Sequence, residues 1–164
     1  MTPRQRYESV RHLMPDADMT LIGDEIKWLD DRPMPSDVDI EAAHHDRLLS
    51  VARNNATERI KAGYRQALST LKSGYLDEEI EGWREQITAA KAHQAGGTSD
   101  FIAKMATKRG ISQSGMAERI LAKREDYLPL YAEATGTLGR LRDEINIAYE
   151  AGNIRELEAI NWPE

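Results

Sequence analysis

The residues that could carry chemistry in this 164-residue chain are its four histidines and its clustered acidic side chains. His44 and His45 are adjacent, with Asp46 next to them. Neighbouring residues on a helix point about 100° apart, whereas side chains that share a metal ion lie three or four residues apart. We therefore interpret this trio as a solvated helix surface and expect no metal site there.

The acidic groups are also explained by local structure. The pairs at 16–18 and 37–39 lack the glycine and the distal glutamate of a calcium-binding loop. The acidic run at 77–81 suits the first turn of a helix, where negative charge is favourable. No Gly-rich phosphate loop, G-x-S-x-G elbow or H-E-x-x-H motif is present, and cysteine is absent, which removes thiolate chemistry. We expect a protein that is not an enzyme and that uses no cofactor, no metal and no catalytic residues.

One basic segment, residues 104–124, has features of a helix-turn-helix. It places six basic residues against Glu118, a local charge of +5: Lys104, Lys108, Arg109, Arg119, Lys123 and Arg124. That sign suits phosphate contacts, and a DNA-binding regulator would act through Ser112, Gln113 and Arg119. However, the apolar spacing of its second helix is one step off, and Gly115 would weaken that helix. We favour an ordinary helical corner and do not expect nucleic acid as the partner.

The first 35 residues predict a small αββ module. Thr2 and Pro3 can begin a helix that ends at Pro15. Alternation of apolar and polar residues then predicts strands at 18–22 and 25–29, joined by a Gly-Asp turn. Such a module is too small to be stable alone, so we expect it to rest on another element or chain.

The remainder of the chain reads as helices. An apolar stripe that begins at Leu48 predicts one long helix over about 37–72, and a restart at Asn54-Asn55 is the alternative. With a second helix that begins at 77, this makes a long helical hairpin over 36–97. Residues 98–164 are expected to form a helical corner, a long coiled-coil-like helix and a C-terminal turn. The predicted fold class is mainly α, with elongated helical hairpins or a coiled coil behind the αββ module.

The most regular pattern runs from Ile120 to Ala148, about four heptads. Pro129 is expected to kink or open this helix. The pattern predicts a homo-oligomer, and an antiparallel helix pair within one chain is the alternative use of the same stripe. Two tryptophans could mark further partner patches, because Trp concentrates at interfaces; the alternative is that all three are separate core anchors. The predicted partner or oligomer interface is Tyr127, Tyr131, Leu138, Leu141, Ile145, Trp28 and Trp162.

The overall charge of −6, from 22 basic and 28 acidic residues, excludes a strongly basic protein that coats nucleic acid. The charge is unevenly distributed, because residues 16–41 hold nine acids against Lys27 and Arg32, a local −7. This dipolar pattern could steer head-to-tail contacts between copies or with a partner. No apolar run approaches the ~20 residues of a membrane span, and no secretory signal is visible, so we expect a soluble intracellular protein without a membrane partner.

Several short motifs follow one another along the chain. They are Arg59-Ile-x-x-x-Tyr64, Tyr75-Leu-Asp-Glu-Glu-Ile-Glu-Gly-Trp83-x-x-Gln86, Ala90-x-Ala92, Phe101-Ile102 with Thr107-Lys-Arg109-Gly-Ile111, Ala117-x-Arg-Ile120-Leu, and Glu158-Ala-Ile160-x-Trp162. In this order and spacing the chain resembles the helical domain of phage tail fibre assembly proteins. Ser99-Asp100 and Pro129 depart from the family's usual pattern.

This resemblance implies a bacteriophage protein that assists tail fibre folding or assembly as a chaperone, through protein–protein contacts in the host cytoplasm. Its partner would be a tail fibre or other tail protein. The alternative within the same family is a structural tail or fibre-attachment component that stays in the virion tail. The family has no established catalytic residues, so none is assigned to this chain.

Overall fold

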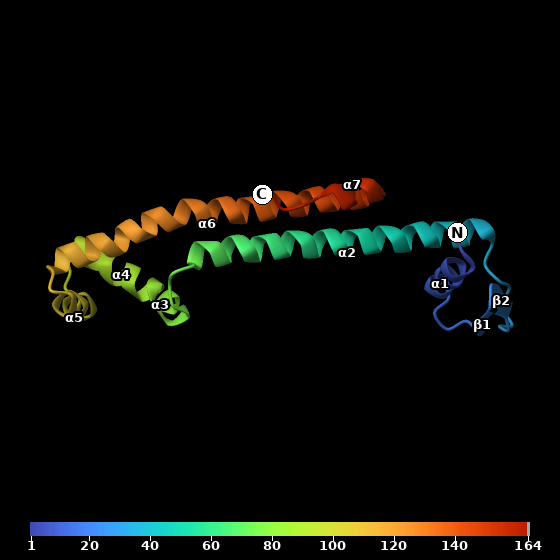
Figure 1. Ribbon diagram of the computed structural model, residues 1–164, viewed down its shortest axis with the longest axis horizontal. Helices are drawn as coiled ribbons and strands as arrows, with labels where there is room; N and C mark the ends of the chain where they lie inside the picture. The colour runs from blue at the N-terminus through green and yellow to red at the C-terminus, as the bar shows by residue number, and fades with distance from the viewer. Residues whose placement is uncertain (164) are drawn as a thin grey trace. The chain divides into compact units, whose positions relative to one another are not determined.

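The computed structural model describes residues 1–163, and the fold is mainly α with a small N-terminal αββ module, which confirms the predicted fold class (Figure 1). The elements are α1 (Pro3–Leu13), β1 (Met19–Ile22), β2 (Glu25–Trp28), α2 (Asp37–Lys72), α3 (Asp77–Glu81), α4 (Trp83–Gln94), α5 (Asp100–Arg109), α6 (Gln113–Glu150) and α7 (Ile154–Ala159). In this part of the chain, none of the helices combines the length and the apolar character that a membrane crossing requires.

The chain packs as two compact units, and each unit joins segments that are distant in sequence. Unit 1 combines residues 1–61 with residues 140–163, and unit 2 consists of residues 62–139. The helices α2 and α6 each contribute to both units. The three segments expected from the sequence (1–35, 36–97 and 98–164) follow chain order, whereas these units do not, because the two long helices bring distant residues together.

In unit 1, the αββ module forms as expected and rests on α2. The Thr2 hydroxyl accepts from the backbone N–H of Gln5, and the Gln5 side chain accepts from the N–H of Thr2, a complete capping box for α1. The hairpin pairs Ile22 with Glu25 across the two-residue turn. Its small core joins Val10 and Met19 to Ile40, and Ile40 belongs to α2. The module therefore obtains its missing apolar partner from the long helix.

The helix α2 is continuous, which settles the choice between one helix and two in favour of one. The Ser36 hydroxyl accepts from the N–H of Asp39 at 3.2 Å, and the helix passes through Asn54-Asn55 to Lys72. One detail of the predicted stripe is wrong, because Leu48 is exposed and its neighbour Leu49 is buried instead. Periodicity gives the width of an apolar face, whereas the packing partner decides which edge of that face is covered.

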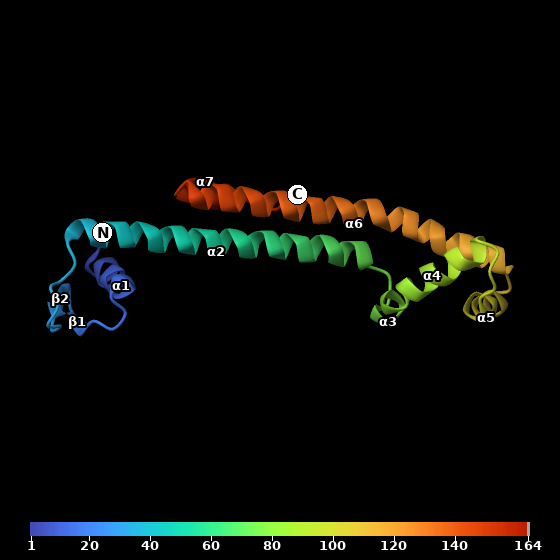
Figure 2. The same ribbon diagram turned by 180° about the vertical axis from the view of Figure 1, so that it is seen from behind.

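Within unit 1, α2 and α6 run antiparallel (Figure 1 and Figure 2). The Arg53 guanidinium donates to the Asn146 side chain at 3.3 Å and lies 4.4 Å from the centre of the Tyr149 ring. Further along, a Cβ at Gly152 would lie 3.6 Å from a ring carbon of His45. The buried side chains of this pair are Leu49, Ala52, Ala56 and Ile60 on α2, and Leu141, Ile145 and Ala148 on α6. Small alanines on both helices permit close packing.

Unit 2 has its own core, made where α4, α5 and the start of α6 meet. The buried members are Ala90, Ile102, Ala106, Met116, Ala117 and Ile120. Ser99 caps α5, and Gly110 ends it with φ +64°. The helix expected from residue 77 is divided at Gly82 into α3 and α4, consistent with the low helix propensity of glycine.

Candidate functional site

Four aromatic rings form a row in unit 2. Tyr75 follows α2, and its ring contacts Trp83 at the start of α4 edge to face, with centroids 5.0 Å apart. Trp83 contacts Tyr127 of α6 in the same way at 5.2 Å, and Tyr127 stacks on Tyr131 at 5.7 Å. Each contact lies within the range that favours aromatic pairs beyond simple burial. The row is therefore built from the loop between α2 and α3 and from the two helices α4 and α6.

An open pocket of about 320 Å³ lies beside this row. Its lining is Leu71, Tyr75, Glu79, Trp83, Gln86, Ile87, Ile120, Lys123, Arg124, Asp126, Tyr127, Leu128 and Leu130. The Lys123 ammonium lies 3.6 Å from the Glu79 carboxylate and 4.8 Å from the centre of the Tyr75 ring. The lining thus combines aromatic and aliphatic side chains with four charged ones, Glu79, Lys123, Arg124 and Asp126, and a concave site with apolar walls and some polar groups is typical of sites that bind another molecule.

The apolar character of the pocket continues onto the surface of α6. Leu128, Leu130 and Tyr131 are exposed large side chains on either side of Pro129. The helix is uninterrupted at Pro129, so the expected opening does not occur there. The proline nevertheless has no N–H to offer to the carbonyl of Glu125. We call the pocket, whose lining includes Leu128 and Leu130, together with the adjoining Tyr131 the aromatic groove.

The ionisation of the aromatic groove is unusual at one position. Burial, and to a smaller extent the neighbouring Tyr131 and Tyr64 hydroxyls, raises the pKa of Tyr127 above its ordinary value of 10.0. A tyrosine phenol with an ordinary or raised pKa is neutral at physiological pH, so the Tyr127 ring brings no charge to the groove.

The predicted interface residues fall into two groups. Leu138 is buried within unit 2, and Leu141 and Ile145 are buried within unit 1. These three side chains are covered by their own chain, which favours the alternative that an intramolecular helix pair uses the stripe. Tyr127 and Tyr131 instead belong to the aromatic groove.

Neither tryptophan predicted for the interface is fully exposed. Trp28 packs against the Val10–Met19–Ile40 cluster, and its indole N–H donates to the carbonyl of Arg32 at 2.7 Å. Trp162 is half-buried after α7. A partner role for either residue stays a prediction, while Trp28 has a clear structural role in the αββ module.

Two motifs that lie far apart in the sequence meet in unit 1. The Arg59 guanidinium donates to the backbone carbonyls of Leu157 at 2.7 Å, Glu158 at 3.1 Å and Ile160 at 3.0 and 3.1 Å. These carbonyls belong to the end of α7, which intrahelical bonds leave without donors. Arg59 therefore closes the C-terminal helix onto α2.

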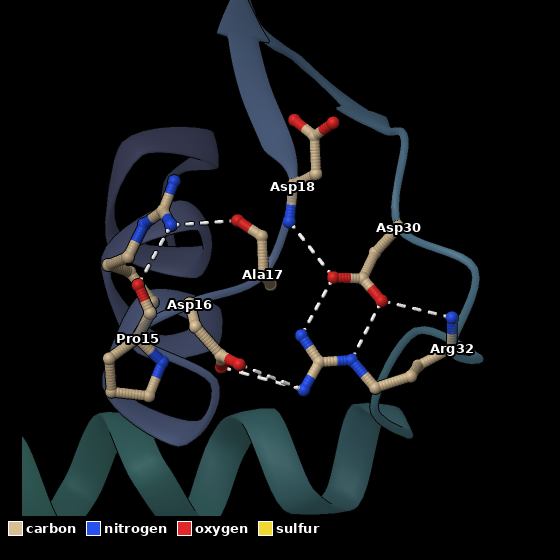
Figure 3. Close-up of polar contacts among 7 residues, drawn as sticks. Pro15, Asp16, Ala17, Asp18, Asp30 and Arg32 are labelled. Carbon is tan, nitrogen blue, oxygen red and sulfur yellow. Dashed lines mark hydrogen bonds and ion pairs between the residues drawn. The ribbon is translucent and has the colours of Figure 1, made fainter.

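The loops of the αββ module are held by a polar network that the sequence did not reveal (Figure 3). The Asp30 carboxylate accepts two bonds from the Arg32 guanidinium, both 2.7 Å, and one from the N–H of Asp18 at 3.0 Å. These bonds hold the pKa of Asp30 well below its usual range. Arg11 donates to the carbonyls of Pro15 and Ala17. The acidic residues of the loop thus have a structural use.

The histidines and acidic residues considered in the sequence are not gathered into one cluster in the described part of the chain. No three His, Cys, Asp or Glu side chains among residues 1–163 are grouped so as to hold a metal ion. His93 lies with Nε2 3.5 Å from the Ser114 hydroxyl, and its buried Nδ1 has no hydrogen-bond partner in residues 1–163. A serine triad requires a carboxylate at that second nitrogen.

The helical corner forms between α5 and α6. The Ser112 hydroxyl accepts from the N–H of Gly115 at 3.0 Å and caps α6. Met116 and Ala117 belong to the core of unit 2, and they lie at the start of α6, which is 38 residues long. The corner therefore has a structural role in unit 2.

A comparison of the chain with protein-family models, with curated proteins and with solved structures found no match.

Proposed function

We propose that this chain is a non-enzymatic phage tail protein that assists the folding or assembly of a tail fibre. In this proposal, the aromatic groove of unit 2 binds an apolar segment of the fibre chain. The observation that carries the proposal is the row of four rings beside an open pocket of about 320 Å³. The resemblance of its motifs to those of tail fibre assembly proteins implies the identity of the client.

The groove has the properties that a surface for transient protein binding needs. Tyr and Trp supply a large contact area with little loss of side-chain freedom, and they dominate the binding energy of many interfaces. Fibre chains that have not yet assembled expose apolar surface and unpaired strand edges, which promote aggregation. A partner that covers such a segment keeps the fibre chain soluble until it assembles.

The test is co-expression with the tail fibre protein of the same phage, comparing two matched leucine variants. Leu130 lines the groove and is 49% exposed, while Leu76 is 72% exposed and does not line it. Because both side chains are largely in solvent, Leu130→Glu and Leu76→Glu should both fold normally. We expect Leu130→Glu to reduce soluble, trimeric fibre and Leu76→Glu to leave it unchanged. Equal fibre yield with the wild type, with Leu130→Glu and with no helper at all would contradict the proposal.

The same proposal distinguishes a transient helper from a virion component. A helper that binds only unassembled fibre is released when the fibre trimer forms, whereas a tail component remains bound. We expect the protein to be absent from purified virions, and virion proteomics measures this directly. Detection at a fixed ratio to the fibre would instead favour the role of a structural tail or fibre-attachment component.

A further inference from the structure

The exposed face of α5 carries an unusual combination of side chains. Phe101, Lys104 and Lys108 are three and four residues apart, so they lie on one face of the helix, and all three are exposed. Phe101 is the single phenylalanine of the chain, and 45% of its surface is exposed. This face therefore carries an exposed apolar side chain near the start of α5, followed by two positive charges.

Local stability does not account for this arrangement. Like charges four residues apart repel each other along a helix. Lys108 lies in the last turn, where the helix dipole favours a cation, but Lys104 lies in the middle of α5. Neither lysine has an ion-pair partner among residues 1–163. A partner that carries negative charge beside an apolar side chain would offset the repulsion between the two lysines and cover Phe101.

The tip of the β1–β2 hairpin has the complementary combination. Ile22 is 61% exposed at the end of β1, and Glu25 lies directly opposite it across the hairpin, so both side chains are on one face. Asp24 occupies the turn between them and is exposed. Here too, the described part of the chain holds no ion-pair partner for Asp24 or Glu25. The tip thus presents one exposed apolar side chain beside two negative charges.

We propose that the hairpin tip of one copy of this chain docks on the α5 face of a second copy. Ile22 then packs on Phe101, while Asp24 and Glu25 lie near Lys104 and Lys108. The longer segments that contain these two surfaces have net charges of the same signs as the surfaces, −7 over residues 16–41 and +5 over residues 104–124. They steer the two surfaces toward each other.

This contact is heterologous, because it joins two different surfaces of the same protein. Each copy retains one unused tip and one unused α5 face, so association continues into a ring or an open chain rather than stopping at a two-fold dimer. The inference is independent of the aromatic groove and of the proposed function. It identifies a head-to-tail self-association site.

The test uses two charge-reversal variants of the full chain. Asp24→Lys with Glu25→Lys makes both surfaces positive, and Lys104→Glu with Lys108→Glu makes both negative. By analytical ultracentrifugation, we expect the wild-type mass to rise with concentration at about 50 mM salt and to fall at about 500 mM salt. Each double variant alone should associate at least about tenfold more weakly, because several exposed ion pairs are replaced by repulsion.

Mixing the two double variants is the decisive measurement. In the mixture, the negative tip of one variant meets the positive α5 face of the other, and the remaining two surfaces also have opposite charges. We therefore expect the mixture to recover the wild-type association, as should a chain carrying all four substitutions. A matched control, Arg84→Glu with Lys91→Glu, reverses two exposed cations of α4 and should associate like the wild type.

Three results would overturn the inference. The first is a wild-type mass that stays constant at every concentration and salt. The second is a mixture that associates no better than its two components. The third is salt-dependent binding of duplex DNA that is lost in Lys104→Glu with Lys108→Glu while self-association is unaffected, since the basic face would then bind nucleic acid. Circular dichroism confirms that each variant keeps its helical content.

Discussion

Replacing Arg59 with alanine should loosen the C-terminal helix of unit 1. The Arg59 guanidinium donates to the carbonyls of Leu157, Glu158 and Ile160, all at 3.1 Å or less. Leu157 and Ile160 are buried, so their position depends on α7 staying in place. The substitution removes every one of these bonds and also removes a positive charge from the negative end of the α7 dipole.

The size of the effect follows from these two contributions. Hydrogen bonds from a charged donor contribute about 1.5–3 kcal/mol to stability. A cation at a helix C-terminus contributes a further ~0.3–1 kcal/mol. Because the four bonds come from a single guanidinium and water can replace them in part at this half-buried site, their contributions do not add in full, and we expect Arg59→Ala to lower the free energy of unfolding by about 2–4 kcal/mol. Arg59→Lys keeps the charge but not the planar fork, so it should lose about half as much.

Two measurements test this prediction. Urea denaturation gives the change in the free energy of unfolding, and hydrogen exchange reports the opening of α7 separately from the rest of the chain. Faster exchange should be concentrated in the amides of residues 154–160. Arg65→Ala is the matched control, because Arg65 is an exposed arginine on the same helix. That control should change stability by less than about 0.5 kcal/mol.

The reasoning would be refuted by an Arg59→Ala protein that matches the Arg65→Ala control in both measurements. In that case, α7 would be held by its apolar contacts alone, and the carbonyls at its end would be satisfied equally well by water. An intermediate result is also informative, because Arg59→Lys as unstable as Arg59→Ala would show that bond geometry outweighs charge.

Three further predictions concern the packing and the loops. Leu141 is 3% exposed, whereas Ile147 on the same helix is 64% exposed. Leu141→Asp should therefore lower the free energy of unfolding by more than ~3 kcal/mol in a urea titration, while Ile147→Asp should change it little. A Leu141→Asp protein that folds normally but has a lower mass in solution would instead return Leu141 to an oligomer interface. The pKa of Asp30 is lowered in the folded state, so its carboxylate stabilises the protein at pH values above the unfolded-state pKa of about 3.9 and loses that contribution as the pH falls. Asp30→Asn should therefore be less stable than the wild type at pH ~7, and the difference in the free energy of unfolding should shrink below pH ~4. A difference that does not change with pH would refute this. Gly110 has φ +64°, so in thermal denaturation Gly110→Ala should lower the stability of the protein by about 1–2 kcal/mol, whereas Gly139→Ala within α6 should raise it slightly. Equal effects of the two substitutions would contradict the role of the left-handed backbone at Gly110.

Local signals predicted the helices and the hairpin well. The Thr2 capping box, the Ser99 cap and the left-handed Gly110 depend on residues within four positions of each other. Such interactions are encoded in short segments, so they can be recognised before any tertiary contact is known. The same reasoning predicted one continuous α2, which the structure confirms.

The candidate site was predicted only in part. Tyr127 and Tyr131 were expected at a partner surface because of their regular spacing, and the structure places both in the aromatic groove. Tyr75 and Trp83 join them from outside α6, and no periodicity within one helix could show that. The choice of Leu49 over Leu48 was likewise decided by packing rather than by pattern.

By itself, the sequence determined the mainly helical class, the positions where most elements begin and end, and the separation of acidic and basic regions along the chain. Tertiary structure alone decided which apolar side chains are covered and which distant residues meet, as when Arg59 reaches the end of α7 roughly a hundred residues later. The physical reason is that caps and turns depend on neighbouring atoms, whereas burial depends on the partner surface. Leu141 and Ile147 have similar chemistry and lie on one helix, but only Leu141 faces the interior of unit 1.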